Sequence, residues 1–182
     1  ANDIFGVSVA INGNDAIIGA RGRTSNQGAA YIFTRQPNGT FSQTAVLTAD
    51  DGRAEDFFGL SVAISGPNAF VGACLADIGT ANDAGALYGF TSTSGLATGP
   101  WVQTRKFARR ANLSNDFVGF SAAASGLTAV VGGYNAASGR GAIWVIDQPD
   151  ALTQSAVNIT ASNTAPNLES AVQAATAGQT VV

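Results

Sequence analysis

The chain has 182 residues, of which 46% are hydrophobic and only 12% are charged, and its formal net charge is −3. This balance gives no basic footprint for nucleic acid, and no apolar stretch is long enough for a membrane span. The chain contains no histidine, which excludes a Ser-His-Asp triad and any histidine metal site. The single cysteine, Cys74, provides no disulfide framework, and we expect it to be a small buried residue.

One phrase returns three times along the chain. It consists of an aspartate, two apolar residues, a glycine and, after one further residue, Ser-Val-Ala or Ser-Ala-Ala. The three copies occupy residues 3–10, 56–63 and 116–123. A period of roughly 55 residues, with several short apolar runs in each copy, predicts a tandem array of small β-sheets.

Each copy continues with further strand-like runs bounded by turn residues. The second runs are residues 16–20, 69–73 and 129–133, and the third runs are residues 28–33, 85–90 and 141–146. A fourth, more polar run occupies residues 41–47 and 101–107, with a weaker copy at 152–157. Four such runs per unit predict four-stranded antiparallel meanders of the propeller-blade type. We expect the units to span about residues 1–53, 54–113 and 114–162.

This pattern resembles the FG-GAP repeat of integrin-type β-propellers and of large bacterial surface proteins. The resemblance covers about residues 1–162 and implies an all-β fold of three four-stranded antiparallel blades. A closed propeller normally needs roughly four to eight blades, so we expect an incomplete propeller. We interpret the chain as part of a larger protein that supplies further blades, with self-assembly of several chains as the alternative.

The repeated aspartates and glycines are expected to be structural. A short carboxylate just before a turn glycine commonly accepts backbone N–H groups, and glycine permits close approaches or positive φ angles that a Cβ forbids. On three different blades, the aspartates would not converge on one catalytic site. The motif residues assigned to this role are Asp3, Phe5, Gly6, Asp56, Phe58, Gly59, Asp116 and Gly119.

The loop between the second and third runs is where the resemblance implies calcium in many integrin-type blades. In the second unit this loop contains two carboxylates, Asp77 and Asp83, with Asn82 beside them. A calcium site normally uses more anionic oxygens, and the corresponding loops of the other two units carry arginine. We therefore expect a solvated loop and no cofactor, with calcium at Asp77, Asn82 and Asp83 as the alternative.

Two charged clusters invite a functional interpretation, and for both we favour a solvated polar segment. The acidic cluster, for which a catalytic pair is the alternative, consists of Asp50, Asp51, Glu55 and Asp56. The basic cluster is expected to face solvent at a blade edge, with binding of an anionic glycan or partner as the alternative. It consists of Arg105, Lys106, Arg109 and Arg110.

Aromatic residues exposed in loops would support sugar binding. The residues to consider are Tyr31, Tyr88, Trp101, Tyr134 and Trp144. We expect Tyr31, Tyr88 and Trp144 to be buried, because they lie on a predicted core strand.

The pattern changes over residues 163–182. Apolar residues at 168, 171, 172 and 175 predict a short amphipathic helix, and a strand begins near residue 179. This stretch resembles the entry to the right-handed parallel β-helix of secreted bacterial proteins, so it would begin a second domain. Asn38, Asn112 and Asn158 fit the glycosylation acceptor pattern, which chance also explains in a chain rich in Asn, Ser and Thr.

The resemblance implies a non-enzymatic scaffold or adhesion module that is extracellular or displayed on a bacterial surface. Its partners would be a protein or glycan at the cell surface, without nucleic acid and without catalytic residues. The alternative is an accessory or carbohydrate-binding domain of a secreted polysaccharide-active enzyme. Fold alone does not choose between these classes.

Overall fold

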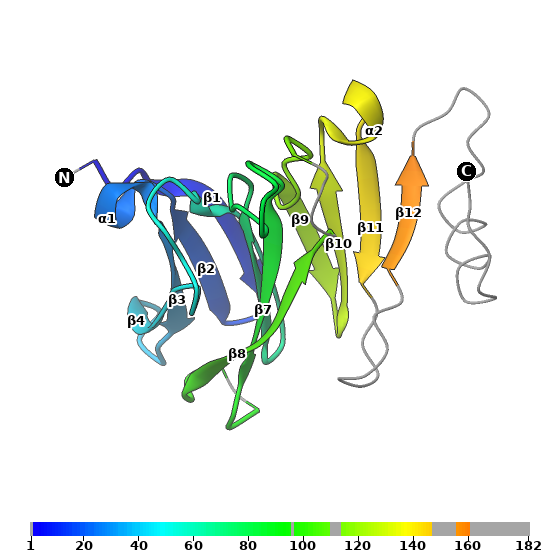
Figure 1. Cartoon of the computed structure of the whole chain (residues 1–182). Helices are drawn as coiled ribbons and strands as arrows, with labels where there is room; N and C mark the ends of the chain where they lie inside the picture. Colours follow the sequence, from blue (N-terminus) through cyan, green and yellow to red (C-terminus); the bar gives the residue numbers. More distant parts are fainter. Residues whose placement is uncertain (1, 96, 110–113, 147–155, 161–182) are drawn as a thin grey trace.

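The computed structural model describes residues 2–95, 97–109, 114–146 and 156–160 (Figure 1). Within these residues the strands form three four-stranded antiparallel sheets, each with its strands in chain order. Sheet 1 comprises β1 (Phe5–Asn12), β2 (Asp15–Ala20), β3 (Ala29–Arg35) and β4 (Phe41–Leu47). Sheet 2 comprises β5 (Phe58–Ser65), β6 (Asn68–Ala73), β7 (Ala86–Ser92) and β8 (Trp101–Ala108). Sheet 3 comprises β9 (Ser121–Ser125), β10 (Thr128–Gly133), β11 (Ala142–Ile146) and β12 (Ala156–Thr160).

The sequence prediction of an all-β fold built from three four-stranded blades is confirmed. One strand was placed wrongly, because the last strand of the third unit was expected at residues 152–157. Strand β12 instead pairs with β11 from Ala156 to Thr160, so that Ala142 lies opposite Thr160. The sequence of residues 152–157 is only weakly similar to the other fourth strands. The helix and strand predicted within residues 163–182 lie outside the described residues.

Two short segments labelled as helices are tight turns that follow the second strand of a sheet. They are α1 (Arg23–Asn26) in sheet 1 and α2 (Ala136–Gly139) in sheet 3. Thr24 and Ser25 have φ angles of 51° and 55°, and Ala137 and Ser138 have φ angles of 53° and 62°. These left-handed angles are not helical. The two turns therefore share one unusual backbone shape. Among the described residues, α1 bonds to the link that enters the next sheet, and α2 does not.

The sheets stand face to face in chain order (Figure 1) and enclose two apolar cores. The first core lies between sheets 1 and 2, where Ile17 and Ile32 meet Phe58, Val62 and Ile64. The second lies between sheets 2 and 3 and includes Ala63, Phe70, Leu87, Val118, Val131 and Trp144. Each inner sheet face thus loses contact with water only because a neighbouring sheet covers it, and this burial is the main stabilising term.

Neighbouring sheets also join through their backbones. The Gly59 carbonyl accepts a hydrogen bond from Ser8 Oγ at 2.8 Å, and it occupies the space that a Cβ on Gly19 would need. The next joint repeats this arrangement. The Gly119 carbonyl accepts a bond from Ser61 Oγ at 2.7 Å and occupies the space beside Gly72. Because a side chain would push the sheets apart, glycine is required on the receiving sheet.

A second set of backbone bonds ties each inter-sheet link to the preceding sheet. The amides of Phe57 and Phe58 donate to the carbonyls of Asn26 and Gln27, at 2.9 and 3.1 Å. At the next joint the amides of Phe117 and Val118 donate to Asp83 and Ala84, at 3.2 and 3.0 Å. Parallel bridges join Gly28 to Phe58 and Gly85 to Val118. The loop after the second strand of a sheet is therefore a receptor for the next sheet.

We predict that Gly72→Ala destabilises the fold by about 1–3 kcal/mol, the usual cost of overpacking a tight contact. The added methyl group would collide with the Gly119 carbonyl of the next sheet. Gly132→Ala is the matched control, because the nearest atom to its new methyl group is the hydroxyl of Ser121, a side chain that can rotate. Urea unfolding should show a much smaller loss for the control. Equal losses would contradict the proposed joint.

Candidate binding surface

The motif aspartates precede the first strands of three different sheets and contact different groups. Asp56 is buried, and its Oδ2 accepts the Arg53 backbone N–H at 2.7 Å. Burial raises the pKa of the Asp56 carboxyl above its usual value, although the bond from the Arg53 N–H opposes this change. Asp116 is also buried and accepts a bond from Arg109 Nη1 at 2.7 Å. At Asp3 it is the backbone carbonyl that accepts a bond, from the Gly22 N–H at 3.0 Å.

The loop predicted to hold calcium as an alternative is occupied by structural hydrogen bonds. Asp77 Oδ1 accepts the Asp83 N–H at 3.0 Å. The carbonyls of Asn82 and Asp83 accept bonds from the amides of Asn115 and Phe117, in the link to sheet 3. Across the described residues, no group of three or more His, Cys, Asp or Glu side chains lies close enough to hold a metal. Calcium at Asp77, Asn82 and Asp83 stays a prediction.

The acidic cluster is distributed among separate contacts at the seam between sheets 1 and 2. Asp51 accepts bonds from Tyr88 Oη at 3.0 Å and Lys106 Nζ at 2.6 Å, while Glu55 accepts a bond from Asn26 Nδ2 at 3.0 Å. Partial burial alone would raise the pKa of the Asp51 carboxyl, but the bonds from Lys106 and Tyr88 outweigh this effect and lower it. These carboxylates hold the link between sheets 1 and 2 against α1 and against strands β7 and β8.

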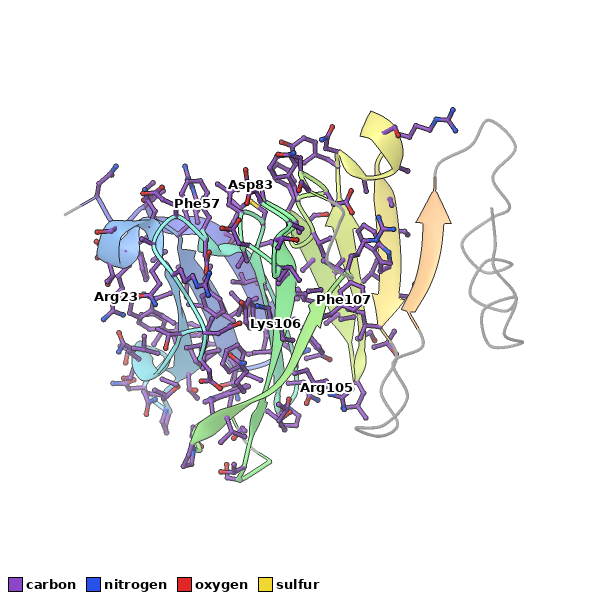
Figure 2. All side chains as sticks on the ribbon, viewed as in Figure 1. Arg23, Phe57, Asp83, Arg105, Lys106 and Phe107 are labelled. Carbon is purple, nitrogen blue, oxygen red and sulfur yellow. The ribbon has the colours of Figure 1, made fainter. Side chains whose placement is uncertain are left out.

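The expectation that the basic cluster faces solvent was wrong for Lys106 and Arg109. Figure 2 shows Lys106 on β8, where its ammonium pairs with Asp51 and lies 5.1 Å from the Tyr88 ring centroid. Arg109 pairs with Asp116 and lies over the Trp144 ring at 5.4 Å. Both side chains are partly buried in these contacts. Arg105 is also engaged in an interaction, and Arg110 lies outside the described residues.

The prediction that three aromatic residues are buried is confirmed for Tyr88 and Trp144. It was wrong for Tyr31, which is only partly buried, because no described sheet covers the face of sheet 1 on which it packs against Phe5. Burial raises the pKa of the Tyr88 phenol, and the neighbouring Asp51 carboxylate adds to this effect. Trp101 is partly buried and donates from Nε1 to the Ala97 carbonyl at 3.0 Å. Tyr134 differs, because 55% of its surface is exposed.

Tyr134 belongs to a cluster that we call the aromatic patch, formed by Phe117 and Phe120 in the link before β9 and by Tyr134 directly after β10. The Tyr134 ring stacks on Phe117, with centroids 5.0 Å apart and planes 3° apart. Phe120 meets Tyr134 edge-on at 4.7 Å and is itself 49% exposed. Beside the patch, Asn135 Nδ2 donates to the Asn115 carbonyl at 2.8 Å. The patch thus combines exposed ring surface with nearby amide groups.

The backbone helps to present this patch. Phe117 has a φ of 55°, a left-handed angle that is unfavourable for a bulky residue. The same angle recurs at Ile4 and Phe57, with φ values of 51° and 60°, so the repeat itself imposes it. Figure 2 places Phe57 at the end of the sheets that carries α1 and α2. The residues at this point of each repeat are therefore held in one orientation.

Sequence reasoning included Tyr134 among the aromatics to consider but missed Phe117 and Phe120 as its neighbours. A comparison of the repeats could have found the patch. Tyr134 stands where the other copies have Arg21 and Cys74, and Phe120 stands where they have Val7 and Leu60. Two aromatic replacements in one copy of a repeat indicate a local role that the fold itself does not need.

The family model for the FG-GAP repeat matches residues 1–33 and 41–90. These residues are FG-GAP repeats. Such repeats build propeller blades, are generally non-enzymatic and typically occur in extracellular proteins. No curated protein matches the chain. Among the described residues, no helix is both long and apolar enough to cross a membrane.

We predict that Cys74 in the second FG-GAP repeat is chemically inert in the native chain. Cys74 is buried, and burial raises the pKa of its thiol to about 11, so little of the reactive thiolate forms at neutral pH. At pH 8, Ellman's reagent should modify the native thiol at least about 100-fold more slowly than the urea-unfolded thiol. Similar rates in the two states would contradict the burial of Cys74.

We predict that Asp51→Asn removes a pH-dependent part of the stability. The Asp51 pKa is lowered in the folded state, so its stabilisation is present above the unfolded value, near 3.8, and is lost as pH falls through the folded value. Because the side chain is largely exposed, the loss at pH 7 should be at most about 1 kcal/mol.

The control for this prediction is Asp50→Asn, a change of the same type at the neighbouring exposed residue. Thermal unfolding should separate wild type from Asp51→Asn at pH 7, and this difference should shrink as the pH is lowered to 3. An equal effect of the two substitutions at pH 7 would sink the prediction.

Proposed function

We propose that the chain is part of a non-enzymatic extracellular or cell-surface adhesion or scaffold module, and that the aromatic patch is its partner-binding site. The observation that carries this proposal is the exposure of two clustered aromatic residues, Phe120 and Tyr134, at repeat positions where the other two units have no aromatic residue. Exposed apolar clusters of this kind mark interaction sites, and aromatic residues are enriched among those that contribute most to binding.

The arrangement suits binding because the patch is held in place before a partner arrives. Phe117 is fixed by the left-handed backbone of the repeat, and its amide is bonded to Asp83. Tyr134 is restrained by stacking on Phe117 and by the edge of Phe120. A preorganised site loses less conformational entropy on binding than a flexible one.

A non-enzymatic role is supported by the chemistry of the chain. It contains no histidine, and its one cysteine is buried with a raised thiol pKa. The carboxylates of Asp51, Asp56 and Asp116 each accept structural hydrogen bonds. These groups hold segments of the chain together, and the aromatic patch is our candidate for contact with another molecule.

A glycan is the second candidate partner, and Tyr134 is the observation that favours it. An exposed ring can cover the apolar face of a sugar, and the amides of Asn115 and Asn135 can serve its hydroxyl groups. In that case the chain would be a carbohydrate-binding or accessory domain of a secreted polysaccharide-active enzyme. The experiment below distinguishes the two partner classes.

We predict that Tyr134→Ala weakens binding to the partner by at least about tenfold, which corresponds to about 1.4 kcal/mol. The labelled chain should be applied to a printed oligosaccharide array and to a panel of immobilised extracellular proteins. Binding to a protein supports the adhesion role, whereas binding to an oligosaccharide supports the carbohydrate-binding role.

The matched control is Phe41→Ala, which removes another exposed aromatic ring from β4 of sheet 1. It should bind like wild type, and both variants should keep the unfolding temperature of wild type within a few degrees. If Tyr134→Ala binds as tightly as wild type, the aromatic patch is not the contact site.

A further inference from the structure

The fold places the acceptor motifs for N-linked glycans in different settings. Asn38 lies in the turn between β3 and β4, where residues 37–40 are all exposed. Asn158 lies inside β12, in register opposite Trp144 of β11, and Asn112 lies outside the described residues. A motif on a surface turn can enter a glycosyltransferase without the loss of strand pairing. Of the two described motifs, Asn38 is therefore the one that the folded chain presents.

The turn that carries Asn38 is closed by local backbone bonds. The Gln36 amide donates to the Thr40 carbonyl at 2.7 Å, and the Gly39 amide donates to the Gln36 carbonyl at 2.8 Å. Gly39 has a φ of 85°, and a Cβ built on it would meet no atom within 4 Å. Among the described residues, no hydrogen bond joins residues 37–40 to another sheet. An enzyme can therefore reach this turn without separating two sheets.

Within the turn, the Asn38 side chain is already oriented by Thr40. The backbone N–H and the hydroxyl of Thr40 both donate to Asn38 Oδ1, at 3.1 and 2.7 Å. No hydrogen bond between described residues uses Asn38 Nδ2. Donors on an amide oxygen stabilise negative charge there, which favours the imidic form of the amide, with a lone pair on nitrogen. Thr40 is thus a positioning residue that turns Nδ2 into the reactive atom.

The strand that follows this turn is an edge strand without charge. Strand β4 is the last strand of sheet 1 and contains no Asp, Glu, Lys or Arg, whereas β8, its counterpart in sheet 2, contains Arg105 and Lys106. Both strands have a register shift against their inner neighbour, so charge is what distinguishes the two edges. Charged side chains on an edge strand oppose pairing with a strand of another molecule. A bulky hydrophilic group at the start of β4 would provide the protection that this strand lacks.

We propose that Asn38 is an N-glycosylation site of the folded chain and that its glycan shields the edge of β4. The donor is a sugar whose C1 carries a diphosphate leaving group, as in nucleotide sugars and lipid-linked sugars. Asn38 Nδ2 forms a bond to C1 while the bond from C1 to the diphosphate oxygen breaks. The diphosphate leaves with the electron pair of that bond, and Nδ2 passes one proton to a base of the transferase.

The site is independent of the sheet faces and of the aromatic patch. Sheets 1, 2 and 3 meet through their faces (Figure 1), whereas Asn38 lies in a turn between two strands at the edge of sheet 1. The aromatic patch lies beside β9 and β10 of sheet 3. The proposal therefore goes beyond the proposed function, and either one can fail without the other.

The test measures sugar transfer to the folded chain. Two N-glycosyltransferases, one that uses a nucleotide sugar and one that uses a lipid-linked sugar, are first selected for activity on a synthetic peptide of residues 34–42. Each is then incubated with the folded chain, and intact mass and peptide mapping locate the added sugar. We expect at least one enzyme to modify Asn38, at least about tenfold faster than Asn158.

Two substitutions of Thr40 test its role in this transfer. Thr40→Ala removes the hydroxyl donor to Asn38 Oδ1 and should reduce transfer to less than about a tenth of the wild-type rate. Thr40→Ser is the matched control, because it keeps the hydroxyl, and it should remain an acceptor. Circular dichroism verifies that both variants are folded.

A second measurement tests the shielding of β4. The glycosylated chain should aggregate more slowly on heating than the unmodified chain. Gln43→Lys, which adds a charge to an exposed position of β4, should also slow aggregation, whereas Asn14→Lys adds the same charge in the exposed turn between β1 and β2 and should have a smaller effect.

Four results would each overturn the proposal. They are failure of both enzymes to modify the folded chain, faster transfer to Asn158 than to Asn38, transfer to Thr40→Ala at the wild-type rate, and equal aggregation of the glycosylated and unmodified chains.

Discussion

The contact on which the structure depends is the approach of one glycine carbonyl to the glycine of the preceding sheet. Gly59 and Gly119 each place a backbone oxygen beside a residue without a side chain and within hydrogen-bond distance of a serine hydroxyl. Both glycines have φ angles near 90°, a region that residues with a Cβ avoid. The joint fixes the spacing of the sheets, so that apolar side chains on facing strands can fill the gap between them. Backbone geometry at two points therefore determines where each core can form.

Charged residues serve the same joints. Lys106 and Arg109 leave β8 and its following link to pair with Asp51 and Asp116, which lie in the links that enter sheets 2 and 3. Each cation also lies over an aromatic ring, that of Tyr88 or Trp144. The chain has few charged residues, and these four fix the links that enter sheets 2 and 3. A cluster that looks like a binding patch in sequence is thus divided among partners in space, and the exposed aromatic patch on sheet 3 becomes the stronger candidate for recognition.

The fold could be predicted from the sequence because the same motif, followed by the same order of strand-like runs, occurs three times. A single copy of Asp-x-x-Gly followed by Ser would have been ambiguous, but its recurrence with the same following runs fixed the strands and their order. Strand β12 was displaced because its sequence diverges from the other fourth strands. The partners of Lys106 and Arg109 could not be predicted, since each lies in a link that only the packing of adjacent sheets brings near. The sequence pointed to only one member of the aromatic patch, Tyr134. Phe117 and Phe120 were missed because they lie within the repeated motif, which was interpreted as structural.

Native-state hydrogen exchange tests the central claim, that the backbone joints make adjacent sheets one cooperative unit, most directly. The amides of Ile17 in β2 and Val71 in β6 belong to different sheets that share the first core. If the joints couple the sheets, these amides should exchange with the same opening free energy and the same dependence on denaturant, because sheet 1 cannot open without exposing sheet 2. If instead the amides of sheet 1 exchange through a separate, smaller opening while those of sheet 2 remain protected, the sheets are independent units and the account of the joints is wrong.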